Sequence, residues 1–171
     1  MNMIKTFYPD RWVTSAFSID YQAMYENGYR GVIFDIDNTL TMHGSPATAQ
    51  CRQLFEQLRL LGMKTCLISN NKENRVKPFA HSVQSPYICN GKKPSRLNYL
   101  KGMKMMKTKR EHTFFVGDQL FTDIWGAKRA GIYAILVDPI DKKEELQIVL
   151  KRYLERPVLK SYQRNLNRSD R

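Results

Sequence analysis

The segment GVIFDIDNTL at residues 31–40 begins with a short apolar run and continues into two carboxylates, Asp35 and Asp37. A run of this length after a turn is typical of a buried strand. Comparable runs rich in β-branched and aromatic residues occur at residues 64–68, 86–89, 113–116 and 133–137. Because each run is nearly continuously apolar, the sequence predicts parallel strands that are covered on both faces.

Helical patterns separate the predicted strands, at residues 45–61, 95–107, 120–130 and 141–155, with a shorter one near 72–80. The first should begin with Ser45 as N-cap and stop at Gly62. The last places one apolar stripe toward the sheet, which we favour over contact with a membrane: Leu146, Val149, Leu150, Tyr153 and Leu154. Pro157 should end this helix. Strands that alternate with helices predict a doubly wound α/β domain with three layers, α/β/α.

The composition describes a basic globular protein. The chain has 171 residues, with 28 Lys and Arg against 16 Asp and Glu. We expect a single domain over residues 1–171, with an N-terminal extension at about 1–30 and a basic tail at about 157–171. No apolar stretch approaches the roughly 18 residues of a membrane span, and no secretory signal is visible, so we expect a cytoplasmic protein. The net charge of +12 indicates an anionic partner without choosing among nucleic acid, a lipid surface and a phosphorylated ligand.

Polar and charged groups follow the predicted strands. Asp35 and Asp37, two residues apart on an extended chain, should point the same way. The groups that follow the next three strands are Ser69, Asn70 and Asn71, then Lys92 and Lys93, then Asp118 and Asp123. Ligands of such sheets bind beyond the carboxyl ends of the strands, so we expect these groups on one rim.

Aspartates gathered on this rim require a cation. Two carboxylates 4 Å apart repel by roughly 4 kcal/mol at an effective dielectric constant of about 20. Oxygen ligands without His or Cys select a hard cation, which predicts Mg²⁺. With the ordinary aspartate pKa of about 3.9, an aspartate is ionised at pH 7 and could attack phosphorus. A second aspartate could protonate the leaving oxygen and then activate water.

Each motif alone also has a plain structural explanation. Acidic residues such as Asp118 and Asp123 favour a helix N-terminus, Ser69 to Asn71 suits a turn, and Lys92 and Lys93 suit a solvated surface. Their joint occurrence at consecutive strand ends, in the required order, favours phosphoryl transfer.

In these motifs the chain resembles the haloacid dehalogenase-like superfamily of phosphotransferases, and within it the bacterial YqeG-type phosphatases. The segments that carry the resemblance are DIDNTL at 35–40, SNNKENRV at 69–76, KP at 93–94 and GDQLFTD at 117–123. The similarity runs from about Ile4 through the C-terminal helix, and it extends to mitochondrial phosphatidylglycerophosphate phosphatases. It implies a Rossmann-like fold of the haloacid dehalogenase type.

The resemblance also implies roles for the aspartates. Asp35 would be the nucleophile, and Asp37 would be the general acid and base whose backbone carbonyl also binds Mg²⁺. Asp118 would bind the metal directly, and Asp123 directly or through water.

The phosphoryl oxygens would be bound by Ser69, Asn70 and Lys93. Lys93 is preferred to Lys92 because the family lysine directly precedes a proline; whether Lys92 assists stays open.

The spacing of the motifs predicts an open site. Neither residues 37–69 nor 69–93 leave the roughly 50 residues of an inserted cap domain, so we expect a capless site that admits a phosphate on something large. Residues 92–110 carry eight basic side chains and no acidic one. Such groups could bind a lipid surface with about 1 kcal/mol each, or could be a solvated face without a partner.

We therefore expect a Mg²⁺-dependent phosphatase that acts on phosphatidylglycerophosphate, peripherally at the inner face of the membrane. Two alternatives stay open: a phosphatase for nucleotides or nucleic-acid ends, and a non-catalytic protein that binds RNA or the ribosome.

Overall fold

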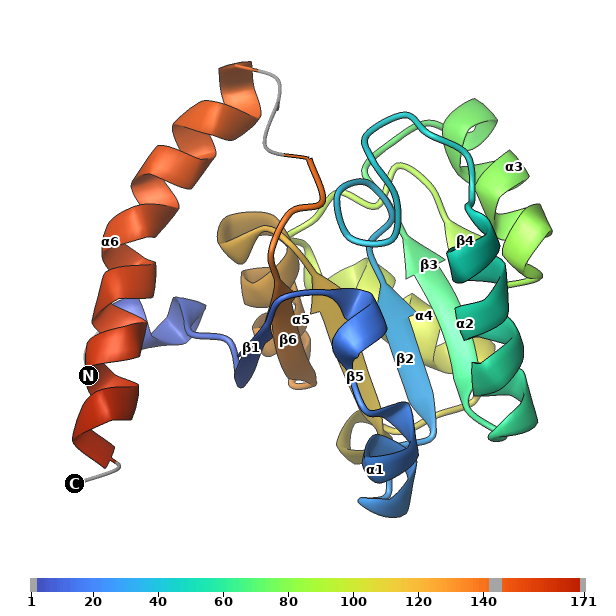
Figure 1. The fold of residues 1–171 in the computed structure, drawn as a ribbon, viewed down its shortest axis with the longest axis horizontal. Helices are drawn as coiled ribbons and strands as arrows, with labels where there is room; N and C mark the ends of the chain where they lie inside the picture. Colours follow the sequence, from blue (N-terminus) through green and yellow to red (C-terminus); the bar gives the residue numbers. More distant parts are fainter. Residues whose placement is uncertain (1–2, 142–145, 170–171) are drawn as a thin grey trace.

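A computed structural model describes the backbone of residues 3–141 and 146–169 and the side chains of residues 4–141 and 153–166. Its centre is a six-stranded sheet in the order β1-β6-β5-β2-β3-β4, and all neighbouring strands run parallel (Figure 1). The strands are β1 (Arg11–Val13), β2 (Gly31–Phe34), β3 (Lys64–Ile68), β4 (Tyr87–Ile88), β5 (Thr113–Gly117) and β6 (Tyr133–Val137). The predicted doubly wound α/β fold is confirmed.

Helices cover both faces of the sheet, and alternate residues of the strands face opposite layers. In β2, Val32 and Phe34 pack into one apolar cluster, whereas Ile33 packs into the other. The first cluster is covered by α1 (Tyr21–Glu26), α2 (Ala49–Leu60) and α3 (Glu73–Val83); the second is covered by α4 (Arg96–Met106) and α5 (Trp125–Ala130). Figure 1 shows α2 and α3 on the near side of the sheet and α4 on the far side. Burial of both faces explains the continuous apolar runs of the strands.

Several predicted boundaries differ from the structure. Helix α2 begins at Ala49, not after Ser45, because the hydroxyl of Thr48 accepts a hydrogen bond from the N–H of Cys51 at 3.2 Å and caps the helix there. The predicted helix at 120–130 is divided into a π-helical turn, η4 (Leu120–Ile124), and α5. Gly131, which directly follows the predicted helix at 120–130, ends α5 with a left-handed φ of 76°.

The N-terminal segment contains a strand that the sequence analysis missed. Strand β1 pairs in parallel with β6, and the 3₁₀ turn η1 (Met3–Phe7) precedes it. The carboxylate of Asp10 reinforces this edge by accepting the N–H of Ala134 at 2.8 Å. At three residues, β1 is too short to show an apolar period.

The C-terminal helix departs most from the prediction. Helix α6 (Leu146–Ser169) continues through Pro157, so the expected break there is wrong, and residues 157–169 are helical instead of a tail. The predicted stripe is also wrong at Tyr153 and Leu154, which are 66% and 56% exposed. The side chains of its other members, Leu146, Val149 and Leu150, lie outside the described residues.

A different face of α6 is buried, formed by Glu155, Val158 and Tyr162 at helical spacing. This face contacts η1 and η4, and Val158 belongs to the apolar cluster that includes Leu136 of β6. Pro157 is exposed on the other side, and the packing of residues on both sides of it holds the helix together although proline cannot donate a backbone hydrogen bond. Among the described residues, no helix combines the length and the apolarity needed to cross a bilayer.

Candidate functional site

The carboxyl ends of the central strands place the predicted residues on one rim. The register aligns Phe34 of β2 with Leu67 of β3 on one side and with Val116 of β5 on the other. The N–H of Asp35 extends the second pairing by donating to the carbonyl of Val116 at 3.0 Å. Asp35 therefore lies at the end of a central strand, between the strand ends that lead to Ser69 and Asp118.

Three aspartates form a buried cluster on this rim. One carboxylate oxygen from each of Asp35, Asp118 and Asp123 lies within 4.8 Å of the others, and the three residues are 6%, 1% and 0% exposed. The hydroxyl of Thr39 lies between two of them, 3.4 Å from Asp35 Oδ2 and 3.3 Å from Asp118 Oδ1. Thr39 was missed by the sequence analysis, although it belongs to the DIDNTL segment.

Lys93 forms ion pairs with two carboxylates of this cluster. Its Nζ donates to Asp35 Oδ1 at 2.5 Å and to Asp123 Oδ1 at 2.6 Å. Burial works against the charge of Lys93, but the charges of Asp123 and Asp35 outweigh it and raise the pKa of the ammonium above its usual range. The structure thus brings Asp35, Lys93, Asp118 and Asp123 together from three separate segments of the chain.

The cluster has the chemistry of a site for a hard divalent cation. Its donors are carboxylate oxygens that face one another, and one ammonium balances only part of their negative charge. Hard cations such as Mg²⁺ prefer ligands of this kind. Asp35, Asp118 and Asp123 therefore fit the metal that the sequence predicts.

The acidity of Asp35 differs from the ordinary value that the sequence analysis assumed. Burial, together with the charges of Asp123 and Asp37, outweighs the opposing effect of Lys93 and raises the pKa of its carboxyl to about 7. Without a cation, Asp35 is therefore only partly ionised at neutral pH.

We expect the affinity for Mg²⁺ to rise with pH until about pH 7 and then to level off. Because Asp35 must lose its proton to bind the metal, a proton competes with the cation below its pKa of about 7 and not above it. The apparent affinity should fall by up to about tenfold per pH unit on the acid side. Calorimetric titration with MgCl₂ from about pH 5.5 to about pH 8.5 measures this; a constant affinity across the range would contradict the assignment of Asp35 as a ligand.

Asp37 is not one of the three clustered carboxylates, although its charge still raises the pKa of Asp35. Its Oδ1 accepts the N–H of Gly44 at 2.9 Å and Nη2 of Arg75 at 2.8 Å, and its Oδ2 accepts Nδ2 of Asn71 at 2.7 Å. The chain turns directly after Asp37: the N–H groups of residues 39–41 all donate to the carbonyl of residue 36, and residue 38 has a φ of 63°.

Arg75 is a functional candidate that the sequence analysis did not single out, and Asn71 was expected only among the polar groups of the rim. Both lie in the SNNKENRV segment, and both hold the carboxylate of Asp37. In the sequence, Arg75 stands out only as a basic residue six positions after Ser69, in the first turn of the helix that follows β3. This spacing alone does not show which carboxylate Arg75 contacts.

The predicted phosphate-binding residues differ in their surroundings. Ser69 is 2% exposed and its Oγ accepts the N–H of Asn71 at 3.1 Å. Asn70 contacts Lys93 directly, since its Oδ1 accepts the N–H of Lys93 at 2.8 Å. Lys92 is exposed, whereas the side chain of Lys93 is buried against the carboxylates. The structure therefore distinguishes the two lysines in favour of Lys93.

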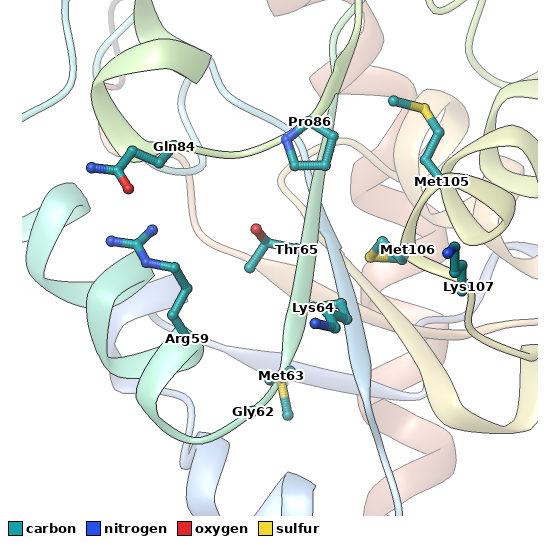
Figure 2. A pocket seen from close by; sticks show the side chains of 10 residues that line it. All are labelled: Arg59, Gly62, Met63, Lys64, Thr65, Gln84, Pro86, Met105, Met106 and Lys107. Carbon is teal, nitrogen blue, oxygen red and sulfur yellow. The ribbon is translucent and has the colours of Figure 1, made fainter.

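The rim has no inserted cap domain, as the spacing predicted. The segments between Asp37 and Lys93 are fully described, and their helices and strands are α2, β3, α3 and β4, which leaves no inserted domain. A small cavity of about 160 Å³ reaches Asp118 between the end of β6 and α6. A larger groove of about 410 Å³ lies at the other end of the sheet, where β3 begins and α4 ends. Figure 2 shows Lys64 and Thr65 of β3 in this groove, so it is not the catalytic cleft.

Comparison with known proteins relates the chain to phosphatases. A family model described as haloacid dehalogenase-like hydrolase matches residues 49–131. The chain is 34% identical over 164 residues to the Bacillus subtilis protein named "Probable phosphatase YqeG", which covers 95% of both chains. It is 26% identical over 163 residues to phosphatidylglycerophosphate phosphatase 1 of Arabidopsis thaliana, which covers 85% of this chain and 45% of that protein.

A solved structure supports the fold. The cobalt-bound deoxy-D-mannose-octulosonate 8-phosphate phosphatase of Haemophilus influenzae superposes with a TM-score of 0.52 at 12% identity, and the match covers 80% of this chain and 90% of that one. The parallel sheet, the carboxylates at its rim and the full-length similarity to YqeG agree, and the chain belongs to the haloacid dehalogenase-like hydrolases as a YqeG-type phosphatase.

Proposed function

We propose that the protein is a Mg²⁺-dependent phosphomonoesterase that acts through an aspartyl-phosphate on Asp35, with phosphatidylglycerophosphate at a membrane surface as its substrate. The observation that carries the chemistry is the buried cluster of Asp35, Asp118 and Asp123 with Lys93 bound to two of its members. One cation and several buried carboxylates are suited to a dianionic phosphate together with a divalent metal.

The reaction takes two steps at phosphorus. A carboxylate oxygen of Asp35 bonds to phosphorus while the bond to the alcohol oxygen breaks, and Asp37 gives its proton to that oxygen. Water then attacks the phosphorus of the aspartyl-phosphate and the bond to Asp35 breaks, while Asp37 takes the proton from the water. Asn71 and Arg75 orient Asp37 for both transfers through their hydrogen bonds to its carboxylate.

The remaining residues bind the phosphoryl group and neutralise its charge. Lys93 donates to a phosphoryl oxygen from beside Asp35, and Asn70 fixes Lys93 through its backbone N–H. Ser69 lies at the neighbouring strand end with its hydroxyl on the same rim. When bound by Asp35, Asp118 and Asp123, Mg²⁺ offsets the negative charge of the carboxylates and of the phosphate.

The proposed substrate follows from the open rim and from the charge beside it. An uncapped site admits a phosphate that projects from a lipid surface. Helix α4 begins three residues after Lys93 and exposes Arg96, Lys101 and Lys104 together with Leu97, which is 68% exposed. Basic groups attract anionic lipids, and an exposed leucine suits the lipid interface. The name of the Arabidopsis relative supports the same substrate.

Nucleic-acid ends are the weaker candidate. Proteins that bind single strands stack bases on aromatic side chains. The aromatic residue of the segment 92–110 is Tyr99, which is 0% exposed and donates to the carbonyls of Thr122 and Asp123. Tyr99 is therefore part of the core and not a stacking platform.

We expect faster phosphate release from phosphatidylglycerophosphate in anionic vesicles than from a 5′-phosphorylated oligonucleotide. Replacing Arg96, Lys101 and Lys104 together with Ala should lower vesicle binding by up to roughly 100-fold, since each basic group near the surface contributes about 1 kcal/mol. Turnover of a small soluble phosphomonoester should stay unchanged in this variant.

Lys77, which is exposed on α3 in the opposite layer, offers a control, and Lys77→Ala should leave vesicle binding as it is. Equal turnover of the oligonucleotide and the lipid would reject the lipid substrate but not the phosphatase chemistry.

A further inference from the structure

Glu155 is a buried carboxylate that lies outside the motifs of the sequence. It is 2% exposed in α6, and its Oε1 accepts the backbone N–H of Leu120 at 2.7 Å and that of Phe121 at 3.4 Å. The family model matches residues 49–131, so Glu155 also lies beyond the matched segment. A buried carboxylate is retained in a protein only where hydrogen bonds or charges compensate its desolvation.

The two N–H groups belong to the start of η4, the turn between Asp118 and Asp123. The first N–H groups of a helical turn have no partner within the turn, and Gln119, at the N-cap position, makes no capping hydrogen bond with its side chain. Glu155 supplies the missing acceptor from 35 residues away. A charged acceptor makes this bond stronger than a neutral cap would.

The turn controls where Asp123 lies. The N–H of Asp123 donates to the carbonyl of Gln119 at 2.9 Å, and its Oδ2 accepts the N–H of Gln119 at 3.1 Å. The carboxylate of Asp123 packs closely against Gly117, since a Cβ added at Gly117 would lie 2.7 Å from Cγ of Asp123. The side chain of Asp123 therefore has little space to move in this direction. A shift at Leu120 would therefore change the distance between Asp118 and Asp123.

Helix α6 is itself fixed to the N-terminal segment. Tyr8 Oη lies 2.7 Å from Ser161 Oγ and accepts Nδ2 of Asn165 at 2.9 Å, and its ring packs edge-on against Tyr162 at 5.3 Å. The helix that carries Glu155 is thus fixed to the N-terminal segment through Tyr8.

We propose that Glu155 is a positioning residue for the phosphatase reaction: by capping η4 from α6, it sets the spacing of the Asp118 and Asp123 carboxylates. The inference rests on the proposed roles of these two aspartates and is independent of which phosphomonoester is the substrate.

Three variants of the full-length protein test this inference. Glu155→Gln keeps an acceptor of the same length, Glu155→Asp withdraws the carboxylate by one methylene group, and Glu155→Ala removes it. Val158→Ala is the matched control, because Val158 is buried one turn later on the same face of α6 and belongs to an apolar cluster. It weakens the docking of α6 and leaves the cap in place.

Four measurements are compared among the variants: kcat and KM for p-nitrophenyl phosphate, the rise of Tm during titration with MgCl₂ alone, the amide hydrogen exchange of Leu120 and Phe121 without metal, and Tm. Glu155→Ala and Glu155→Asp should lower kcat/KM or the affinity for Mg²⁺ by about 10- to 100-fold and speed the exchange of both amides. Glu155→Gln should stay within roughly threefold of the wild type. Val158→Ala should lower Tm without these changes.

The proposal would be overturned if Glu155→Ala and Val158→Ala lost equal amounts of kcat/KM and of Tm and had the same midpoint for MgCl₂. Glu155 would then only anchor the helix. If Glu155→Ala does not fold, Glu155→Asp decides: wild-type kcat/KM and wild-type amide exchange in that variant also overturn it. Inactivity of the wild type toward p-nitrophenyl phosphate would concern the proposed function, and the metal titration and the amide exchange would still test Glu155.

Discussion

Replacing Asp35 with Asn is expected to abolish phosphate release from every phosphomonoester while the fold persists. An amide cannot form the aspartyl-phosphate, so kcat should fall by on the order of 10⁴-fold or more. The variant should remain folded, because burial disfavours the charge of Asp35 and Lys93 keeps its hydrogen bond to Asp123. Phosphate release and circular dichroism of the same preparation measure both effects.

The control for this variant is Asp20→Asn. Asp20 is an exposed N-cap whose carboxylate accepts the N–H of Ala23 at 2.9 Å, and asparagine caps helices equally well. Its activity should equal that of the wild type. Wild-type activity in Asp35→Asn would instead remove Asp35 as the nucleophile and, with it, the proposed chemistry.

Replacing Lys93 with Met should be the most destabilising change on the rim. It leaves Asp35, Asp118 and Asp123 buried together without their ammonium, and loss of one partner of a buried ion pair costs about 3–5 kcal/mol. Phosphatase activity should be lost as well. Mg²⁺ should restore part of the stability, because the cation takes over the compensation of charge. Urea unfolding with and without MgCl₂ measures the free energy of unfolding in both states.

Lys92→Met removes the same charge from the neighbouring position. Since Lys92 is exposed, we expect the free energy of unfolding to change by no more than about 0.5 kcal/mol, with activity close to that of the wild type. If Lys92→Met and Lys93→Met changed the free energy of unfolding and the activity equally, Lys93 would act through the general basic charge of the surface and not through its contacts with Asp35 and Asp123.

The strands and the rim were predictable from the sequence because their physical causes are local. Parallel strands covered on both faces must be apolar throughout, and polar residues directly after such strands reach the ligand-binding edge. This reasoning correctly placed Asp35, Lys93, Asp118 and Asp123 on one rim. It failed at Pro157, where a local rule predicted the end of a helix that contacts with η1 and η4 maintain.

The amino-acid sequence by itself determined the order of the elements and the kinds of chemical group at the strand ends, since both depend on residues a few positions apart. Only the tertiary structure decided which atoms meet: Lys93 with Asp35 and Asp123, Arg75 with Asp37, and Glu155 with the start of η4. Burial and charge around a group come from segments that are distant along the chain. For this reason the pKa of Asp35 near 7 and the capping of η4 could not be deduced from local spacing.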